Sequence, residues 1–317
     1  MVIKKIKIDQ SSDILRRALC VIALSAFVAL VSLANAKPIL EPIAMRATGA
    51  SGVQEGIVKL ADSNIEYFSQ GNGEPIVLLP FGSLTIGYLD GVAQDLAHAG
   101  YRVVRINFRG SGKSTGSGER VTLHTLASDV AGVIQALKLG PVNVAGHAFG
   151  NRVARTLAAD HPELVHSVIL FAAGGKVPPA PPAEQALKTI FNPKATDEDI
   201  QKAMNFLVSD PRDIPLVWHL IKPCRSPEAA GIQRTAMDNT PLNEWWAPPG
   251  DSKYLVVQGT EDQIAPPKNG ELLKEEMGAR VTLVALPGAG HMLILTEPQK
   301  AVDALVAFLR SLARQSK

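Results

Sequence analysis

The segment Val142–Ala154 has the residue types and spacing that most clearly indicate chemistry. It is predicted to form a buried strand that runs directly into Gly146-His147-Ala148-Phe149-Gly150 and then into a helix. Apart from one residue this is Gly-x-Ser-x-Gly, the sharp strand-to-helix turn called the nucleophile elbow. Glycines flank that turn because the strand and the helix approach too closely for side chains. Ala148 stands at the serine position, and alanine has no hydroxyl with which to form an acyl-enzyme.

Further motifs follow in the chain, each at the expected end of a strand or helix. Arg109-Gly110-Ser111-Gly112-Lys113-Ser114 precedes the elbow, and His161-Pro162-Glu163 follows its helix. Gly259-Thr260-Glu261-Asp262 comes after one late strand, and Pro287-Gly288-Ala289-Gly290-His291 comes after the last. Nucleophile position, acid and histidine in this order resemble the α/β-hydrolase fold superfamily. The resemblance extends from about Val53 to the C-terminus, apart from one insertion.

This resemblance implies a role for each matching position. Asp262 would accept a hydrogen bond from one ring nitrogen of His291 and hold the other nitrogen towards the substrate as a base. An oxyanion hole would be formed by the backbone N–H groups of Phe149 and Phe81. Many relatives have His-Gly at the second of these positions, whereas this chain has Pro80-Phe81-Gly82-Ser83. The identity of that donor therefore departs from the family pattern.

Ala148 leaves three interpretations of the function open. In the first, His291 activates a water or removes an acidic proton from the substrate, so that the protein is a catalyst without a serine nucleophile. In the second, another hydroxyl is recruited, for which Ser83 is the first candidate and Ser111 and Ser114 are the others. In the third, the protein is a non-catalytic receptor for a small apolar or carbonyl ligand.

Several other side chains are candidates for the substrate pocket or its cover. Trp218, His219, Trp245 and Trp246 either line the roof of a pocket or anchor its cover, and His147 is expected to pack beside the elbow. No segment resembles a nucleotide, flavin or metal site, and Arg109–Ser114 lacks the spacing of a phosphate-binding loop. We therefore expect a small-molecule substrate or ligand and no cofactor.

The elements that must position these residues alternate between strand and helix. Short apolar runs such as Ile76–Leu79 are typical of buried parallel strands, and amphipathic segments such as Leu123–Leu139 are predicted helices. This alternation predicts an α/β-hydrolase fold, with a mostly parallel sheet and helices on both faces. Residues 176–251 break the alternation. They contain no strand signal, and we interpret them as an inserted helical cap.

The N-terminal residues have the three parts of a secretory signal peptide. A basic segment up to Arg17 precedes an apolar run from Ala18 to Leu33, which ends in Ala34-Asn35-Ala36. This pattern predicts a signal peptide over residues 1–36, and export to the periplasm or outside the cell. The alternative is an uncleaved membrane anchor. A tether over 37–51 and a hydrolase-like domain over 52–317 would follow.

Composition and charge narrow the possible partners. The 317-residue chain is 46% hydrophobic, which supplies enough apolar material for a sizeable core. Its formal net charge of only +2 gives no electrostatic argument for binding nucleic acid. We expect no stable membrane partner after signal cleavage. Loss of Cys20 with the signal peptide would leave Cys224 unable to form an internal disulfide.

Overall fold

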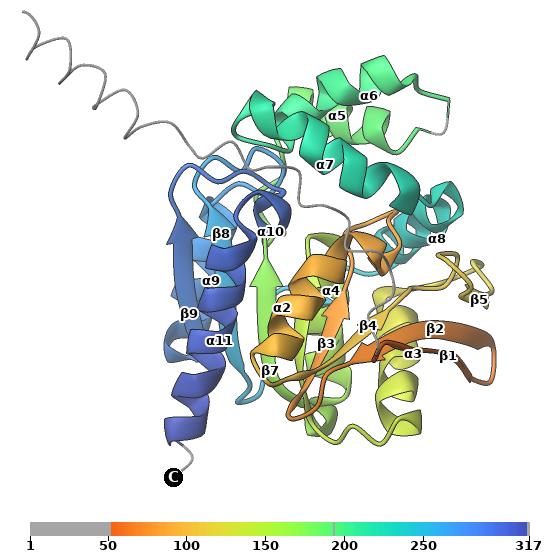
Figure 1. The fold of residues 1–317 in the computed structure, drawn as a ribbon, viewed down its shortest axis with the longest axis vertical. Helices are drawn as coiled ribbons and strands as arrows, with labels where there is room; N and C mark the ends of the chain where they lie inside the picture. The colour runs from red at the N-terminus through yellow and green to blue at the C-terminus, as the bar shows by residue number, and fades with distance from the viewer. Residues whose placement is uncertain (1–51, 193, 316–317) are drawn as a thin grey trace, which may run out of the picture. The chain divides into compact units, whose positions relative to one another are not determined.

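A mostly parallel β-sheet lies at the centre of the described chain, which in this computed structural model comprises residues 52–192 and 194–315 (Figure 1). The strand order is β1-β2-β4-β3-β6-β7-β8-β9, and β5 pairs with β2. Pairing is antiparallel for β1 with β2 and for β2 with β4 and β5, and parallel from β4 to β9. The strands are β1 (Gln54–Lys59), β2 (Ser63–Gln70), β3 (Pro75–Leu79), β4 (Arg102–Ile106), β5 (Thr115–Gly116), β6 (Val142–His147), β7 (Val165–Phe171), β8 (Lys253–Gly259) and β9 (Val281–Leu286).

Helices cover both faces of this sheet, and the α/β-hydrolase fold predicted from the sequence is confirmed. The α-helices are α2 (Asp90–His98), α3 (Leu123–Ala136), α4 (Phe149–Asp160), α5 (Pro181–Ile190), α6 (Asp197–Ala203), α7 (Ile214–Ile221), α8 (Pro227–Asp238), α9 (Lys268–Met277), α10 (Leu293–Thr296) and α11 (Pro298–Gln315). Short 3₁₀ turns connect several of them.

The period of two along each strand divides the core into two layers. In β3, Ile76 and Leu78 pack in the layer that α2 and α11 cover, whereas Val77 and Leu79 pack in the layer of α3, α4 and α9. Successive side chains of a strand point to opposite faces, so an unbroken apolar run is what a sheet covered on both sides requires. The sheet is thereby held rigidly, with the carboxyl ends of its parallel strands at one edge.

The helical segment between β7 and β8 lies beyond this carboxyl edge (Figure 1). It contains α5 to α8, and a single β-bridge between Leu84 and Arg225 connects it to the loop after β3. The sequence predicts a helix over Ile214–Ile221, and α7 has these bounds, whereas α8, α10 and the two-residue strand β5 were not predicted. Helix α8 was missed because Gly231 and several polar residues leave only a weak apolar stripe.

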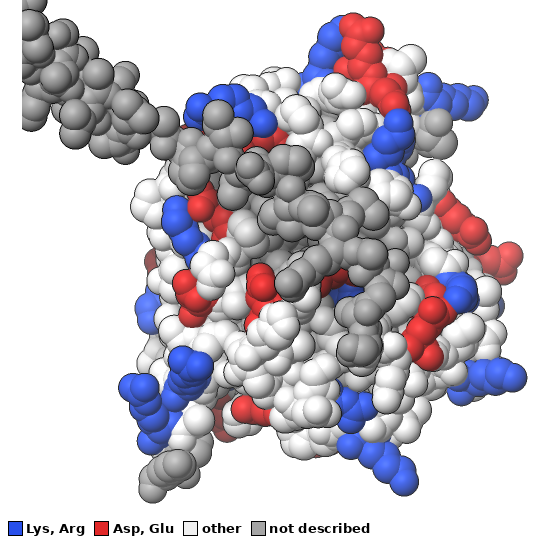
Figure 2. Space-filling model, in the orientation of Figure 1, with Lys and Arg blue, Asp and Glu red and all other residues white. Residues whose placement is uncertain are grey.

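Charges on the described surface are mixed in sign. On the face drawn in Figure 2, basic and acidic side chains lie in small neighbouring groups over the part that the structure describes. None of the helices within residues 52–192 and 194–315 is long and apolar enough to span a bilayer. The expected signal peptide and tether lie outside the described residues.

Candidate active site

The turn between β6 and α4 has the geometry of a tight elbow. Ala148, at its apex, has φ 50° and ψ −101°, a conformation that side-chain-bearing residues rarely adopt. A Cβ atom on Gly146 would lie 2.3 Å from the backbone carbon of Gly150, and one on Gly150 would lie 2.5 Å from the carbonyl oxygen of Leu79. Both glycines are therefore required by close backbone approach, as the sequence predicted. The Ala148 methyl group, partly exposed, faces the cavity described below.

Asp262 and His291 form a buried hydrogen-bonded pair. The Nδ1 atom of His291 lies 2.9 Å and 3.1 Å from the two carboxylate oxygens of Asp262. The carboxylate also accepts hydrogen bonds from the backbone N–H groups of Ile264 and Ala265 and from the Gln258 amide. An ionised carboxylate only accepts, so Nδ1 carries the proton and donates it. The other ring nitrogen, Nε2, is buried without a hydrogen-bond partner among the described residues.

Two close backbone contacts hold the histidine loop in place. A Cβ atom on Gly259, at the end of β8, would lie 2.3 Å from the Ala289 carbonyl oxygen, so the acid-bearing and histidine-bearing loops touch directly. On the other side, the Met292 N–H donates to the Leu207 carbonyl of the cap at 2.9 Å. The imidazole is therefore oriented both by the sheet and by the cap.

His147 lies beneath this loop and supports it. Its Nε2 lies 3.1 Å from the His291 carbonyl oxygen, and its Nδ1 lies 3.0 Å from the Tyr88 hydroxyl. A carbonyl can only accept, so Nε2 carries the proton and Nδ1 accepts from Tyr88. Burial lowers the pKa of His147 to about 3, with a smaller contribution from neighbouring His291, and burial raises the pKa of Tyr88. His147 is therefore a neutral positioning group and does not line the cavity.

The structure supports one of the two expected oxyanion donors and replaces the other. The Phe149 N–H, at the start of α4, has no hydrogen-bond acceptor among the described residues. The Phe81 N–H, by contrast, donates to the Tyr88 hydroxyl at 2.7 Å, so it is not available to a substrate. The next residue, Gly82, has an N–H without a partner in the described chain, and a Cβ atom placed on it would lie 3.3 Å from the Phe149 Cβ. The Phe81 N–H expected as a donor is therefore engaged by Tyr88, and the N–H one position later, that of Gly82, is the one left without a partner in the described chain.

A cavity of about 670 Å³, here called the cap cavity, lies between the carboxyl edge of the sheet and the helices α5 and α8. Its volume is in the range of small-molecule sites. Ala148, Phe149, Gly82 and His291 line its floor, and Ser83 lies beside them. The sequence-based candidates Ser111 and Ser114 are not among its lining residues. The Ser114 hydroxyl donates to the Asn107 carbonyl, which is a structural role.

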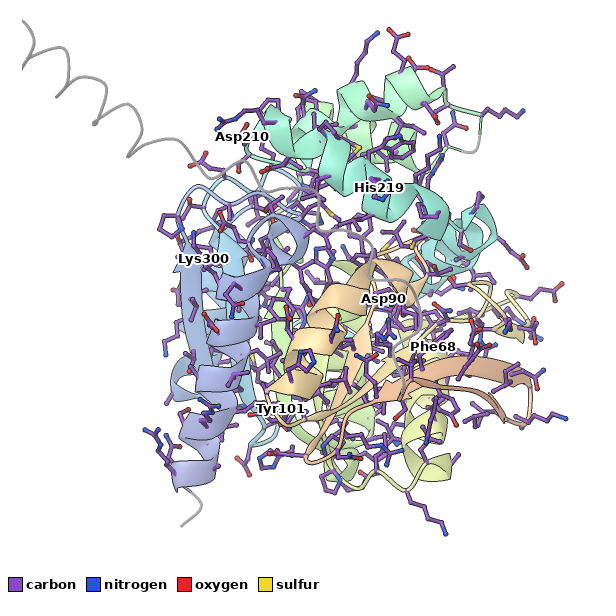
Figure 3. The ribbon with its side chains drawn as sticks, viewed as in Figure 1. Phe68, Asp90, Tyr101, Asp210, His219 and Lys300 are labelled. Carbon is purple, nitrogen blue, oxygen red and sulfur yellow. The ribbon has the colours of Figure 1, made fainter. Side chains whose placement is uncertain are left out.

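Of the two alternatives for the aromatic residues of the cover, the structure favours anchors over lining of the cavity roof. Trp218 and Trp245 are buried in separate core layers and do not line the cap cavity. Trp246 donates from its indole nitrogen to Glu276 at 2.9 Å, and His219 is exposed on α7 (Figure 3). Large aromatic rings stabilise most when fully buried, so the tryptophans hold the cap segment on the sheet.

Sequence reasoning missed the polar residues that do line the cavity. Arg152 projects from α4, and Gln233 and Arg234 come from α8. Arg152 lies in the first turn of the helix that follows the elbow, four residues after Ala148, and this position next to the elbow could have identified it. The residues of α8 gave no comparable signal, because only the folded cap brings them over the elbow. Within the described chain, no group of His, Cys, Asp or Glu side chains is placed to hold a metal ion.

Comparison with known proteins agrees with this architecture. Residues 74–230 match the family model for the alpha/beta hydrolase fold, and residues 230–315 match a model described as TAP-like protein. The described chain therefore has the α/β-hydrolase fold, and the two models together match residues 74–315. It is similar to a non-heme chloroperoxidase of Streptomyces lividans, with 25% identity over 291 residues that cover 81% of this chain and all of the relative.

Solved structures show the same fold at lower sequence identity. An esterase from Thermogutta terrifontis superimposes with a TM-score of 0.70 at 21% identity, covering 81% of this chain and 98% of the esterase. An enol-lactonase from Burkholderia xenovorans superimposes with a TM-score of 0.68, also at 21% identity, covering 80% of this chain and 100% of the lactonase. At such identities the likeness establishes the fold alone.

Proposed function

We propose that this protein is an exported hydrolase-like catalyst that acts on a small ester or carbonyl compound through Asp262 and His291, without a serine nucleophile. One observation carries the proposal. The Nε2 atom of His291 is buried and unpaired among the described residues, and His291 lines the same cavity as Ala148. A buried polar atom without a partner is unfavourable unless a ligand or water supplies one. The relative named as a non-heme chloroperoxidase, at 25% identity over 81% of this chain, is in keeping with a small substrate.

For an ester, the arrangement supports direct attack by water. His291 Nε2 takes a proton from a water as its oxygen bonds to the carbonyl carbon, and Asp262 stabilises the imidazolium. The carbonyl electrons move to oxygen, where the N–H groups of Gly82 and Phe149 stabilise the negative charge. The tetrahedral intermediate then expels the alcohol, which leaves with the proton from Nε2. All atoms balance without a covalent enzyme intermediate.

Ala148 limits the rate of this reaction. Removing the serine of a hydrolase triad costs on the order of a millionfold in turnover, and about 10³–10⁴ over water remains from the oxyanion hole and binding. The substitution therefore predicts slow hydrolysis of simple esters, or a substrate whose chemistry needs only a base. Ser83 lines the cavity, but no hydrogen bond joins its hydroxyl to His291.

Hydrolysis of p-nitrophenyl acetate and butyrate by the wild type and four variants tests the proposal. We expect weak turnover in the wild type, loss of at least tenfold in His291→Ala, and a large gain in Ala148→Ser. The matched control is His219→Ala, an exposed histidine on α7 that should leave the rate unchanged. Ser83→Ala should also retain the wild-type rate. A wild-type rate that His291→Ala does not change would refute the catalytic role.

A non-catalytic ligand-binding protein is the second candidate, favoured by the absence of a side-chain oxygen at Ala148 within a preserved cavity. It predicts measurable binding of short esters by calorimetry, with no product after prolonged incubation. If Ala148→Ser also gains no activity, the receptor interpretation is supported over the catalytic one.

Export rests on the pattern of residues 1–36 and needs its own experiment. We expect the protein expressed with its full leader to be recovered in the periplasm or medium with Lys37 as its first residue. N-terminal sequencing measures this directly. An intact N-terminus in the membrane fraction would instead identify an uncleaved anchor.

A further inference from the structure

Arg152 is a cation without an anion inside the cap cavity. Its guanidinium carbon lies 4.9 Å from the centre of the Trp245 ring, which is a cation–π contact with an indole. The side chain lines the cavity and is only partly exposed. It makes no hydrogen bond or ion pair with any residue of 52–192 or 194–315. Its donors therefore remain available to a bound molecule.

The two most deeply buried arginines, Arg155 and Arg109, are hydrogen-bonded to acceptors, unlike Arg152. Arg155, one turn from it on the same helix, donates to the carbonyl oxygens of Asn151, Gly174 and Trp246. Arg109 is paired with the Asp129 carboxylate through two hydrogen bonds of 2.7 and 2.8 Å. These structural arginines thus have acceptors built around them, and Arg152 does not among the described residues.

The charges that face the cavity leave an excess of positive charge. The charged residues lining it are Arg152, Arg234, Lys188 and Glu184, together with the titratable His291. Glu184 is paired with Lys188 at 2.6 Å on α5. Glu184 also interacts electrostatically with Arg234, so one carboxylate faces three cations, and Arg152 has no carboxylate of its own among the described lining residues. Asp262 is buried behind His291 and is already hydrogen-bonded to it.

The excess of positive charge in the cap cavity is energetically significant because the Arg152 guanidinium is largely removed from water. Burial lowers the pKa of Arg152 to about 10, which leaves the guanidinium charged at neutral pH. A partly desolvated guanidinium without an anion is unfavourable, and a carboxylate relieves this through two parallel hydrogen bonds to the planar fork. The contact with Trp245 leaves the N–H donors of the guanidinium without an acceptor among the described residues.

We propose that the cap cavity binds a small molecule that carries a carboxylate, held by the Arg152 guanidinium. Resting on the function proposed above, the same molecule places its reacting carbonyl between His291 and the N–H groups of Gly82 and Phe149. Arg152 lies in the first turn of α4, four residues after Ala148 at the apex of the elbow, and both residues line the cavity, so the charged group and the reacting centre of the ligand would lie close together. Arg234 is exposed on α8 and also lines the cavity, so its positive charge adds electrostatic attraction for the carboxylate of the ligand.

Calorimetric titration of the purified protein with matched pairs of ligands tests this assignment without using turnover. The pairs are butyrate with butyramide and benzoate with benzamide, and inorganic phosphate is a separate arm. We expect each acid to bind at least tenfold more tightly than its amide. Arg152→Met should weaken binding of the acid about 10- to 100-fold, and Arg152→Lys, which keeps the charge but not the fork, should lie between.

Controls separate this proposal from the catalytic one. Arg314→Gln, an exposed arginine at the end of α11, should bind acids as the wild type does. His291→Ala should retain the preference for acids over amides even though turnover is lost. Equal affinity for acids and amides, or unchanged acid binding in folded Arg152→Met and Arg152→Lys, would overturn the assignment. Binding of phosphate in preference to both acids would also overturn it.

Discussion

His147 should make the stability of this protein depend on pH between about 3 and 6.5. The imidazole is 1% exposed and neutral, and burial lowers its pKa to about 3. In the unfolded chain its pKa is about 6.5. Between these two values the unfolded chain binds a proton that the folded protein excludes, so the free energy of unfolding rises with pH. The stabilisation is fully present above pH 6.5 and is lost as the pH falls towards 3.

The magnitude follows from the two pKa values. Each pH unit below 6.5 removes about 1.4 kcal/mol, so lowering the pH from 8 to 5 should remove about 2 kcal/mol through His147 alone. We expect His147→Gln to be less stable at pH 8, because the His291 carbonyl and the Tyr88 hydroxyl lose a partner. Its stability should nevertheless fall less steeply on acidification.

Urea unfolding of both proteins at several pH values from 5 to 8 measures this difference. Tyr88→Phe is the matched control, since it removes the hydrogen bond at Nδ1 but leaves the imidazole buried. Its stability should therefore show the same pH dependence as that of the wild type. If the free energy of unfolding of His147→Gln ran parallel to that of the wild type across this range, the reasoning would be refuted.

Three further predictions concern stability and can be checked by urea or thermal unfolding. Asp129→Asn should destabilise the fold by about 3 kcal/mol, because it removes a carboxylate from the buried Arg109, whereas loss of the exposed partner Asp62 should remove less than about 1 kcal/mol. If Asp129→Asn changed the free energy of unfolding only slightly, the contact with Asp62 would be enough to compensate the charge of Arg109. Gly150→Ala should destabilise by about 2 kcal/mol or more, since the new Cβ would lie 2.5 Å from the Leu79 carbonyl oxygen, whereas Gly231→Ala, with open space around it on α8, should be neutral or stabilising. Equal changes in the free energy of unfolding at Gly150 and Gly231 would contradict the close approach of α4 to the end of β3. Ala148→Gly should stabilise by about 1 kcal/mol, because relief of the strained φ exceeds the added freedom of the unfolded chain, and a loss of stability there would argue against strain.

Local patterns predicted most of the elements around the site. The apolar runs of β3 and β6, and the bounds of α7 and β9, were evident because each depends on the period and composition of a short segment. The two glycines of the elbow were likewise evident, since backbone crowding at a strand-to-helix turn permits few other residues. The approach of Asp262 to His291 could be expected from the order of the motifs, but the distance could not.

Other features depended on contacts between distant segments. Phe81 was assigned as a donor, yet its N–H is engaged by Tyr88, a residue seven positions away whose orientation depends on the packing around His147. The sequence left open whether the tryptophans line the cavity roof or anchor its cover, and the structure buries them away from the cavity. Composition alone cannot distinguish an aromatic residue that lines a cavity from one that anchors its cover.

The sequence by itself determined the α/β alternation, the position of the elbow and the absence of a hydroxyl at Ala148, because these are properties of adjacent residues. Only the tertiary structure decided that Gly82 rather than Phe81 has a free N–H, and that Arg152 has no anion beside it among the described residues. Hydrogen-bond satisfaction and charge balance are settled by which groups from separate elements meet in space. Here the groups that meet belong to segments far apart in the chain, because α5 and α8 pack over the edge of the sheet that carries the elbow.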